Sequence, residues 1–219
     1  MIEVLYEDNH LIAVNKKSGD IVQGDKTGDI PLCDLVKTYI KNKYKKNGKV
    51  FLGTIHRLDR PTSGIVVYAR TSKSLRRMNE QFRKREVQKT YLAVVCHSPP
   101  NKSGTLEHYL QKNKKNNKSY TTTKKNGKHA ILFYRTLKKL DRFYLLEIKP
   151  QTGRHHQIRV QLSEIGCVIK GDLKYGARRS NKDSSIHLLA KEITFTHPVK
   201  KEKIKIIAPA PKDNIWDVC

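Results

Sequence analysis

One acidic residue stands out because basic and turn-forming residues surround it. Residues 56–70 read His-Arg-Leu-Asp-Arg-Pro-Thr-Ser-Gly-Ile-Val-Val-Tyr-Ala-Arg, so Asp59 lies between Arg57 and Arg60. An arginine beside a carboxylate favours its ionised form and can bind it through two hydrogen bonds. An ionised carboxylate can act as a nucleophile or take a proton. More often, however, such residues form only a surface ion pair beside a turn.

The residues after this acid predict a rigid support for it. Pro61 fixes φ and Gly64 supplies backbone freedom, so residues 60–64 are expected to form a tight loop. The apolar and β-branched run 65–69 that follows predicts a buried strand. An acid on a loop that leads into a core strand is held stiffly, which a catalytic group requires.

A second candidate is a tyrosine in a predicted strand. Residues 87–95 alternate as a strand does, and Lys-Thr-Tyr-Leu-Ala at 89–93 places Tyr91 near its middle. A tyrosine in a strand is more often part of the core than a ligand. The local pattern alone therefore assigns it to packing.

The third candidate segment is Gln-Thr-Gly-Arg-His-His-Gln-Ile-Arg-Val at residues 151–160. Thr152 can cap a helix that ends near Gly166. In such a helix His156 and Arg159 are three residues apart and share a face.

Together these segments resemble the motifs of the RluA family of RNA pseudouridine synthases. Residues 56–64 are similar to the family's central motif, 89–93 to its second block, and 151–160 to its Gly-Arg-x-His-Gln-x-Arg-Val motif. Residues 15–19, Asn-Lys-Lys-Ser-Gly, resemble its Asn-Lys-Pro-x-Gly turn. The resemblance extends over about residues 2–212.

The resemblance implies a role for each motif. Asp59 would be the catalytic carboxylate, Tyr91 would pack against the target uracil, and Arg159 would pair with the catalytic acid. Arg57 would fill the space that the displaced uridine leaves. The remaining expected substrate-binding residues are His56, Lys16, Arg154 and Ile158. No cofactor and no metal are implied, because the isomerisation loses no atom.

Two positions depart from the family pattern. Lys17 stands where the family usually has proline, so we expect the 15–19 segment to be mainly structural, with Lys16 near the catalytic acid. His155 replaces the usual Thr or Ser, which is expected to alter backbone contacts without abolishing the chemistry.

The composition indicates a polyanionic partner. Lys and Arg total 45 against 20 acidic residues, a formal charge of +25, which suits RNA or an anionic membrane surface. Because no apolar run approaches the roughly 18–20 residues of a membrane span and no signal-peptide pattern occurs, we expect a soluble cytoplasmic protein that binds RNA.

The cysteines and histidines predict neither a disulfide framework nor a metal site. The four cysteines are far apart and form no Cys-x-x-Cys pair, and the nine histidines show no metal-binding spacing. Reduced thiols are expected. We also expect a monomer that needs no protein partner.

Periodicity predicts further elements. Apolar residues after Pro31 repeat at helical spacing, with lysines on the opposite face. Thr71 or Ser72 can cap a second helix that runs to about residue 85. Strands are predicted or implied at 2–6, 10–15, 104–110, 130–136, 142–149, 186–190, 193–198 and 204–208.

A lysine-rich segment has two open interpretations. Residues 112–128 contain seven lysines and no acid, a composition typical of an exposed β-hairpin or a mobile loop. Functionally, the segment is either a solvated loop or an arm that binds RNA phosphates. Lysines without interleaved aromatic residues would bind the backbone rather than read bases.

The resemblance implies an α+β pseudouridine synthase fold, with a long mixed, mostly antiparallel sheet, flanking helices and a central active-site cleft. We expect a single catalytic domain over residues 1–219, without the S4 domain that some relatives carry, acting on a ribosomal or transfer RNA stem-loop. The alternative is a non-catalytic RNA-binding or ribosome-assembly protein, which would not need Asp59, Tyr91 and Arg159 together. A metal-dependent nuclease requires clustered carboxylates, and here they are scattered.

Overall fold

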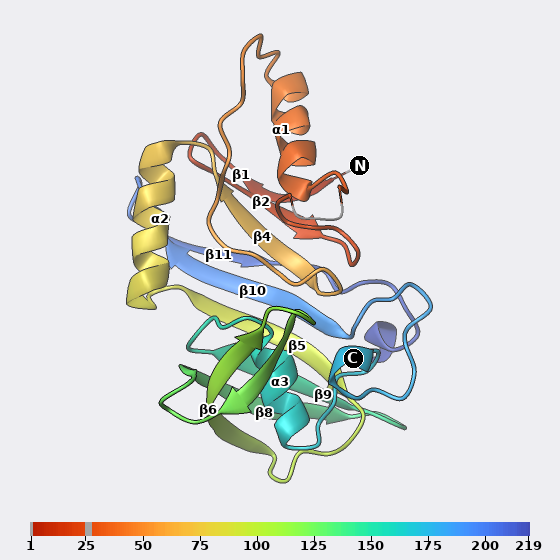
Figure 1. The fold of residues 1–219 in the computed structure, drawn as a ribbon. Helices are drawn as coiled ribbons and strands as arrows, with labels where there is room; N and C mark the ends of the chain where they lie inside the picture. The colour runs from red at the N-terminus through yellow and green to blue at the C-terminus, as the bar shows by residue number, and fades with distance from the viewer. Residues whose placement is uncertain (1, 25–27) are drawn as a thin grey trace. The chain divides into compact units, whose positions relative to one another are not determined.

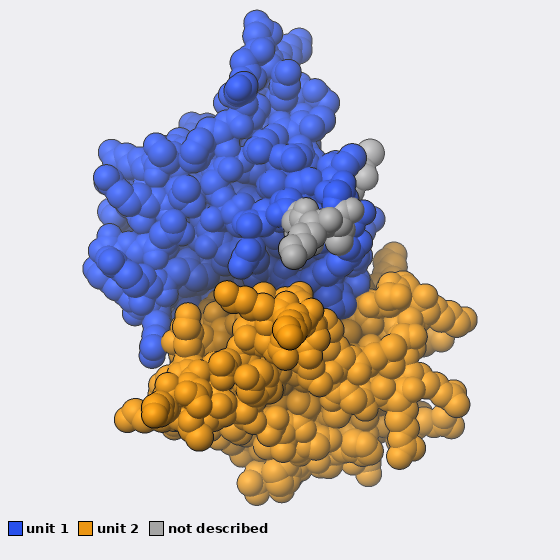
Figure 2. Space-filling view, in the orientation of Figure 1, with its two compact units in different colours: residues 1–88, 190–210 blue, residues 89–189, 211–219 orange. Residues whose placement is uncertain are grey.

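The computed structural model describes residues 2–24 and 28–219, in two compact units (Figures 1 and 2). Unit 1 comprises residues 1–88 and 190–210, and unit 2 comprises residues 89–189 and 211–219. Within the described residues the chain forms eleven strands and three α-helices. The single catalytic domain expected over the whole chain stays a prediction.

The strands of unit 1 begin with the two predicted at the N-terminus, which are confirmed as an antiparallel pair. The second of them pairs antiparallel with the strand that follows the 60–64 loop. The strands are β1 (Glu3–Glu7), β2 (Leu11–Lys16), β3 (Gly53–Thr54), β4 (Ser63–Ala69), most of β10 (Leu188–Thr196) and β11 (Lys203–Ile207). The sheet order is β1-β2-β4-β10, with β11 paired to β10 and β3 to β4.

β4 is the core strand predicted after the acidic motif. All seven of its residues are buried, which explains the continuous apolar run. Its register places Gly64 opposite Lys16 of β2. Gly64 has φ +112°, and a Cβ there would collide with the backbone of Ala190. Only glycine therefore fits at the start of this strand.

Both predicted helices of unit 1 are present (Figure 1). α1 (Leu32–Lys43) follows Pro31 and buries Leu32, Val36 and Ile40 against β2 and β4. α2 (Ser72–Lys84) begins as predicted, because the Thr71 side chain accepts a hydrogen bond from the Ser74 amide at 3.1 Å. These two local signals, a proline and a threonine cap, set the helix starts.

Unit 2 is built on an antiparallel sheet in which the order is β5-β9-β8-β6-β7. α3 packs Ile158 and Leu162 into a cluster with Ala93, Leu132 and Ile148. The bounds are β5 (Gln88–Val95), β6 (Ser103–Asn113), β7 (Lys118–Thr122), β8 (Lys128–Lys139), β9 (Tyr144–Pro150) and α3 (Gln157–Glu164).

The lysine-rich segment 112–128 forms a hairpin, not a structureless loop. β6 and β7 pair antiparallel through Asn113 and Lys118. β6 extends beyond the predicted 104–110 because it pairs with β7 as far as Asn113, and β8 extends beyond the predicted 130–136 because it pairs with β9 as far as Lys139. Similarly, the two closing segments predicted at 186–190 and 193–198 lie largely in one strand, β10.

The start of α3 differs from the prediction. Thr152 was expected to cap the helix, but its hydroxyl accepts from the Ile131 amide at 2.9 Å and donates to Gln157 Oε1 at 2.7 Å. The bond from Ile131 holds Thr152 against β8, and the helix begins only at Gln157, after His156 with φ 54°. No helix within the described residues is both long and apolar enough to cross a membrane.

Candidate active site

The loop that carries Asp59 is closed by its own backbone. The Thr62 amide donates to the Asp59 carbonyl at 3.0 Å. Arg57 is exposed to solvent. Arg60 forms an ion pair with Asp29 at 2.7 Å, with both side chains about half exposed. The two arginines beside the acid thus differ, because Arg57 is exposed whereas Arg60 pairs with Asp29.

Lys16 is buried beneath this loop and holds it by hydrogen bonds. Its side chain is 0% exposed, and Nζ donates to the carbonyls of Lys17, Arg60 and Thr62 at 2.9, 2.9 and 2.7 Å. Burial lowers the pKa of Lys16 to about 8, although the carboxylates of Asp20 and Asp59 act in the opposite direction. An ammonium group that is fully buried and bonded to three carbonyls cannot contact a substrate from this position. Lys16 instead holds the loop in place.

The neighbouring glycine turn adds two more bonds to the same loop. The Gly19 amide donates to the Arg60 carbonyl at 2.9 Å, and the Ser18 hydroxyl donates to the Pro61 carbonyl at 3.2 Å. The 15–19 segment is therefore structural, as expected, and acts on residues 60–62. Lys17 in place of proline leaves the turn intact.

His56 is anchored within unit 1. Its Nε2 accepts a hydrogen bond from the Val67 amide at 3.1 Å, and its ring stacks on Phe82 with centroids 5.3 Å apart. These contacts join the start of the motif to β4 and α2. His56 therefore sets the path of the chain leading to Asp59.

In unit 2, Arg159 forms a two-point ion pair. Its Nε and Nη2 donate to Oδ2 and Oδ1 of Asp172 at 2.7 and 2.8 Å, with side-chain exposures of 5% and 1%. The guanidinium carbon also lies 5.1 Å from the ring centroid of Tyr175. A planar fork bound on one edge and faced by a ring has a fixed orientation.

Tyr175 links this arginine to the hairpin. Its hydroxyl accepts from the Ser119 amide at 2.9 Å, donates to the Ser119 carbonyl at 3.1 Å, and lies 2.9 Å from His156 Nδ1. Burial, and next the charge of Arg159, lower the pKa of His156 to about 2. His156 is consequently neutral at physiological pH and adds no charge beside Arg159.

The remaining expected residues of unit 2 lie in or beside its core. Tyr91 is half-buried in β5 opposite Ile148 and packs against the cluster that contains Ile158, which is 7% exposed. Arg154 Nε donates to the His129 carbonyl at 2.8 Å. His155 Nδ1 lies 2.8 Å from Ser119 Oγ, so this departure from the family pattern ties the turn to the hairpin.

Asp172 and Tyr175 were given no role by the sequence. The available signal was the adjacent glycines: Gly171 has φ +88° and Gly176 φ +105°. Glycines at such angles bracket a turn whose geometry other residues rarely adopt. Separately, no group of three or more His, Cys, Asp or Glu side chains in residues 2–24 and 28–219 could hold a metal ion.

Comparison with known sequences gives consistent matches. A family model described as RNA pseudouridylate synthase matches residues 10–164. The chain is 32% identical to uncharacterized RNA pseudouridine synthase YlyB of Bacillus subtilis, covering 97% of this chain and 70% of that protein. It is 34% identical to ribosomal large subunit pseudouridine synthase C of Vibrio vulnificus, covering 94% of this chain and 65% of that protein. It is 33% identical to tRNA pseudouridine synthase C of Pectobacterium carotovorum, covering 95% of this chain and 59% of that protein.

The chain thus spans between 59% and 70% of the length of these three relatives. Two solved structures share its fold. Human RNA pseudouridylate synthase domain containing 4 has a TM-score of 0.82 at 24% identity, over 99% of this chain and 91% of that one. Human RNA pseudouridylate synthase domain containing 1 has a TM-score of 0.77 at 22% identity, over 100% of this chain and 87% of that one. The α+β fold expected from the sequence is confirmed.

Proposed function

Because the chain belongs to the RNA pseudouridylate synthase family, we propose that it isomerises specific uridines of a structured ribosomal or transfer RNA to pseudouridine. Family membership confirms the recognition made from the sequence motifs. The names of the relatives mention the ribosomal large subunit in one case and tRNA in another. Both RNA classes are therefore candidate substrates.

The reaction exchanges one bond for another. The bond from the ribose C1′ to N1 of uracil breaks, the freed base turns, and C1′ bonds to C5, whose proton is then lost while N1 gains one. We assign Asp59 as the carboxylate that starts this exchange, either as a nucleophile on the sugar or as a base. The observation that carries this assignment is the loop that holds it, fastened by the buried ammonium of Lys16.

Other side chains are assigned supporting roles. Tyr91 is proposed to stack on the displaced uracil, and Arg159, held by Asp172, to keep the catalytic carboxylate ionised. Arg57 is exposed, as a residue that replaces the displaced base in the stack must be. His56, Arg154 and Ile158 make contacts within the protein, so we propose that they shape the site.

The competing function is RNA binding without catalysis. A formal charge of +25 would serve that function equally well. It would not require an acid in a loop fastened by a buried lysine, because a carboxylate opposes the binding of RNA. The two functions predict different effects of removing Asp59: an enzyme would lose activity, whereas a protein that only binds RNA would have no activity to lose.

The test is Asp59→Asn, with Asp29→Asn as the matched control, since Asp29 is an acid that pairs with Arg60 of the same loop. The target uridine is first identified by mapping pseudouridines in total RNA from cells with and without the gene. We expect Asp59→Asn to abolish product on that RNA while affinity is kept or increases. The control should keep activity within a few-fold. Activity of Asp59→Asn near that of the wild type, with unfolding in urea unchanged, would refute the assignment.

We also propose that the protein acts as a monomer in the cytoplasm. The support is that all four cysteines are free thiols, which suits a reducing compartment. Sedimentation analysis of the purified protein with and without RNA would test the oligomeric state. A dimer in either sample contradicts the proposal.

A further inference from the structure

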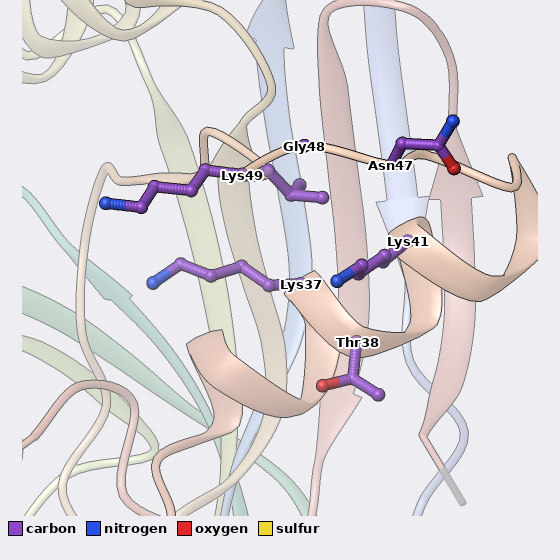
Figure 3. Close-up of a pocket in the computed structure, with 7 residues that line it drawn as sticks. Lys37, Thr38, Lys41, Asn47, Gly48 and Lys49 are labelled. Atoms are coloured by element: carbon purple, nitrogen blue, oxygen red, sulfur yellow. The ribbon is translucent and has the colours of Figure 1, made fainter.

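A cavity of about 360 Å³ lies between α1 and the segment that follows it (Figure 3). We call it the α1 cavity. Its volume falls within the range of ligand-sized pockets, on the order of 300–1,000 Å³. The residues that line it are Lys37, Thr38, Lys41, Asn47, Gly48, Lys49 and Val50.

The α1 cavity carries an excess of positive charge. Of its three lysines, Lys37 bonds Asp34 at 2.8 Å, and no ion pair within the described residues joins a carboxylate to Lys41 or Lys49. By contrast Lys43, on another side of the same helix, pairs with Glu7 at 2.6 Å. Like charges that line one cavity repel each other, and a bound anion would relieve that repulsion.

The lysines approach the cavity from two walls. In Figure 3 the side chains of Lys37 and Lys49 extend in the same direction, one from α1 and one from the 47–50 segment. Lys41 and residues 47–49 are exposed to solvent. Lys45 and Lys46, which join the two walls, are exposed as well, so the positive charge continues beyond the cavity.

This arrangement fits a polyanion better than a small anion. A single phosphate held only by exposed ammonium groups is bound weakly, because water competes for both partners. When several spaced lysines contact the phosphates of a nucleic acid, many counterions are released, and this release increases affinity. None of the described residues that line the cavity is aromatic, so they offer no stacking surface for a base.

We propose that the α1 cavity binds the phosphodiester backbone of the RNA substrate and takes no part in the chemistry. The proposal rests on the proposed function, because that function supplies the RNA. The cavity would increase affinity uniformly, in the substrate complex and in the transition state alike. Its loss should therefore raise the concentration of RNA required and leave turnover on saturating RNA unchanged.

Chemical footprinting locates the contact directly. The wild-type protein is acetylated with sulfo-NHS-acetate alone, with purified ribosomal RNA, or with inorganic phosphate, and modified lysines are identified by mass spectrometry. We expect RNA to protect Lys37, Lys41 and Lys49, and inorganic phosphate to protect none of them. Lys73 and Lys203, exposed lysines of the same unit, are the internal reference. Protection by phosphate alone, or equal protection of the reference lysines, overturns the proposal.

A matched pair of variants gives the energetic test. For Lys41→Gln with Lys49→Gln, the slope of log affinity against log salt on a fluorescent oligouridylate should fall by roughly 0.7 per lost contact. Lys73→Gln with Lys203→Gln removes the same charge and should keep the wild-type slope. Equal slopes in the two double variants overturn the proposal. The readout is binding, so it stands whether or not Asp59→Asn abolishes catalysis, and failure here leaves that assignment untouched.

Discussion

Arg159 and Asp172 form a buried ion pair that uses both oxygens of the acid and one edge of the guanidinium, at 2.7 and 2.8 Å. Two buried charges cost desolvation energy that their attraction only partly returns, so such a pair is weak evidence for stability. What it does achieve is a single orientation of the arginine. Asp172 follows Gly171, where a Cβ would lie 2.7 Å from the Ser185 carbonyl, so the acid has a fixed position too.

The first prediction concerns Asp172→Asn. This change keeps the size of the side chain but removes the negative charge from one member of a buried ion pair. We expect the free energy of unfolding to fall by about 3–5 kcal/mol, measured in urea, and turnover to fall sharply. Arg159→Lys keeps the charge and loses the fork, so turnover should fall while the salt dependence of RNA binding stays the same. Wild-type turnover in both variants would remove Arg159 from the mechanism.

The second prediction concerns Tyr91→Phe. The ring remains, so RNA affinity should change little, because stacking needs only the aromatic face. If the hydroxyl takes part in removing the proton from the displaced base, turnover should fall sharply. Tyr144→Phe is the matched control, since Tyr144 packs against the same core cluster. Equal turnover in the wild type and Tyr91→Phe would confine Tyr91 to packing.

The third prediction concerns the hairpin. Lys114, Lys115, Lys124 and Lys125 are exposed in its turns, whereas Lys118 lies over the Tyr175 ring and is left unchanged. If they contact phosphates, replacing all four with Gln should lower the slope of log affinity against log salt by up to roughly 0.7–0.9 per contact. Turnover on saturating RNA should hold. An unchanged slope would mean that the hairpin turns are simply solvated.

The fourth prediction concerns Lys16→Met. Methionine fills similar space but donates no hydrogen bond, so three carbonyls lose their partner. Each buried polar group left unsatisfied costs about 1–3 kcal/mol. We expect a loss of unfolding free energy in urea and, because the Asp59 loop loosens, a lower turnover. Lys17→Met, an exposed neighbour, should behave as wild type. Unchanged stability in Lys16→Met would show that water replaces the ammonium without cost.

The same lysine predicts a pH dependence. Its pKa is about 8 in the folded protein and about 10.4 in an unfolded chain. Between these values the unfolded state binds more protons, so the contribution of Lys16 to the unfolding free energy should rise with pH over about 8–10.4 and be constant above. The measurement is the difference in unfolding free energy between wild type and Lys16→Met across this window. A flat difference would mean that Lys16 keeps its proton in the folded protein.

The sequence by itself determined those features whose causes lie within a few residues. Thr71 caps α2 through an amide three residues away, and the apolar run after Gly64 forms the buried strand β4. The motif order around Asp59, Tyr91 and Arg159 was enough to recognise the family, because it is a long, ordered pattern. Short-range hydrogen bonds and periodicity are visible in one dimension.

The tertiary structure decided which partners those residues have. Lys16 bonds carbonyls 44 and 46 positions away, and Arg159 bonds an acid 13 positions on. Thr152 binds β8 instead of capping α3, since the Ile131 amide reaches its hydroxyl only when the sheet has formed. Such pairings depend on which strands lie side by side. No spacing along the chain encodes them, because the free energy that selects them comes from satisfying buried polar groups in the folded protein.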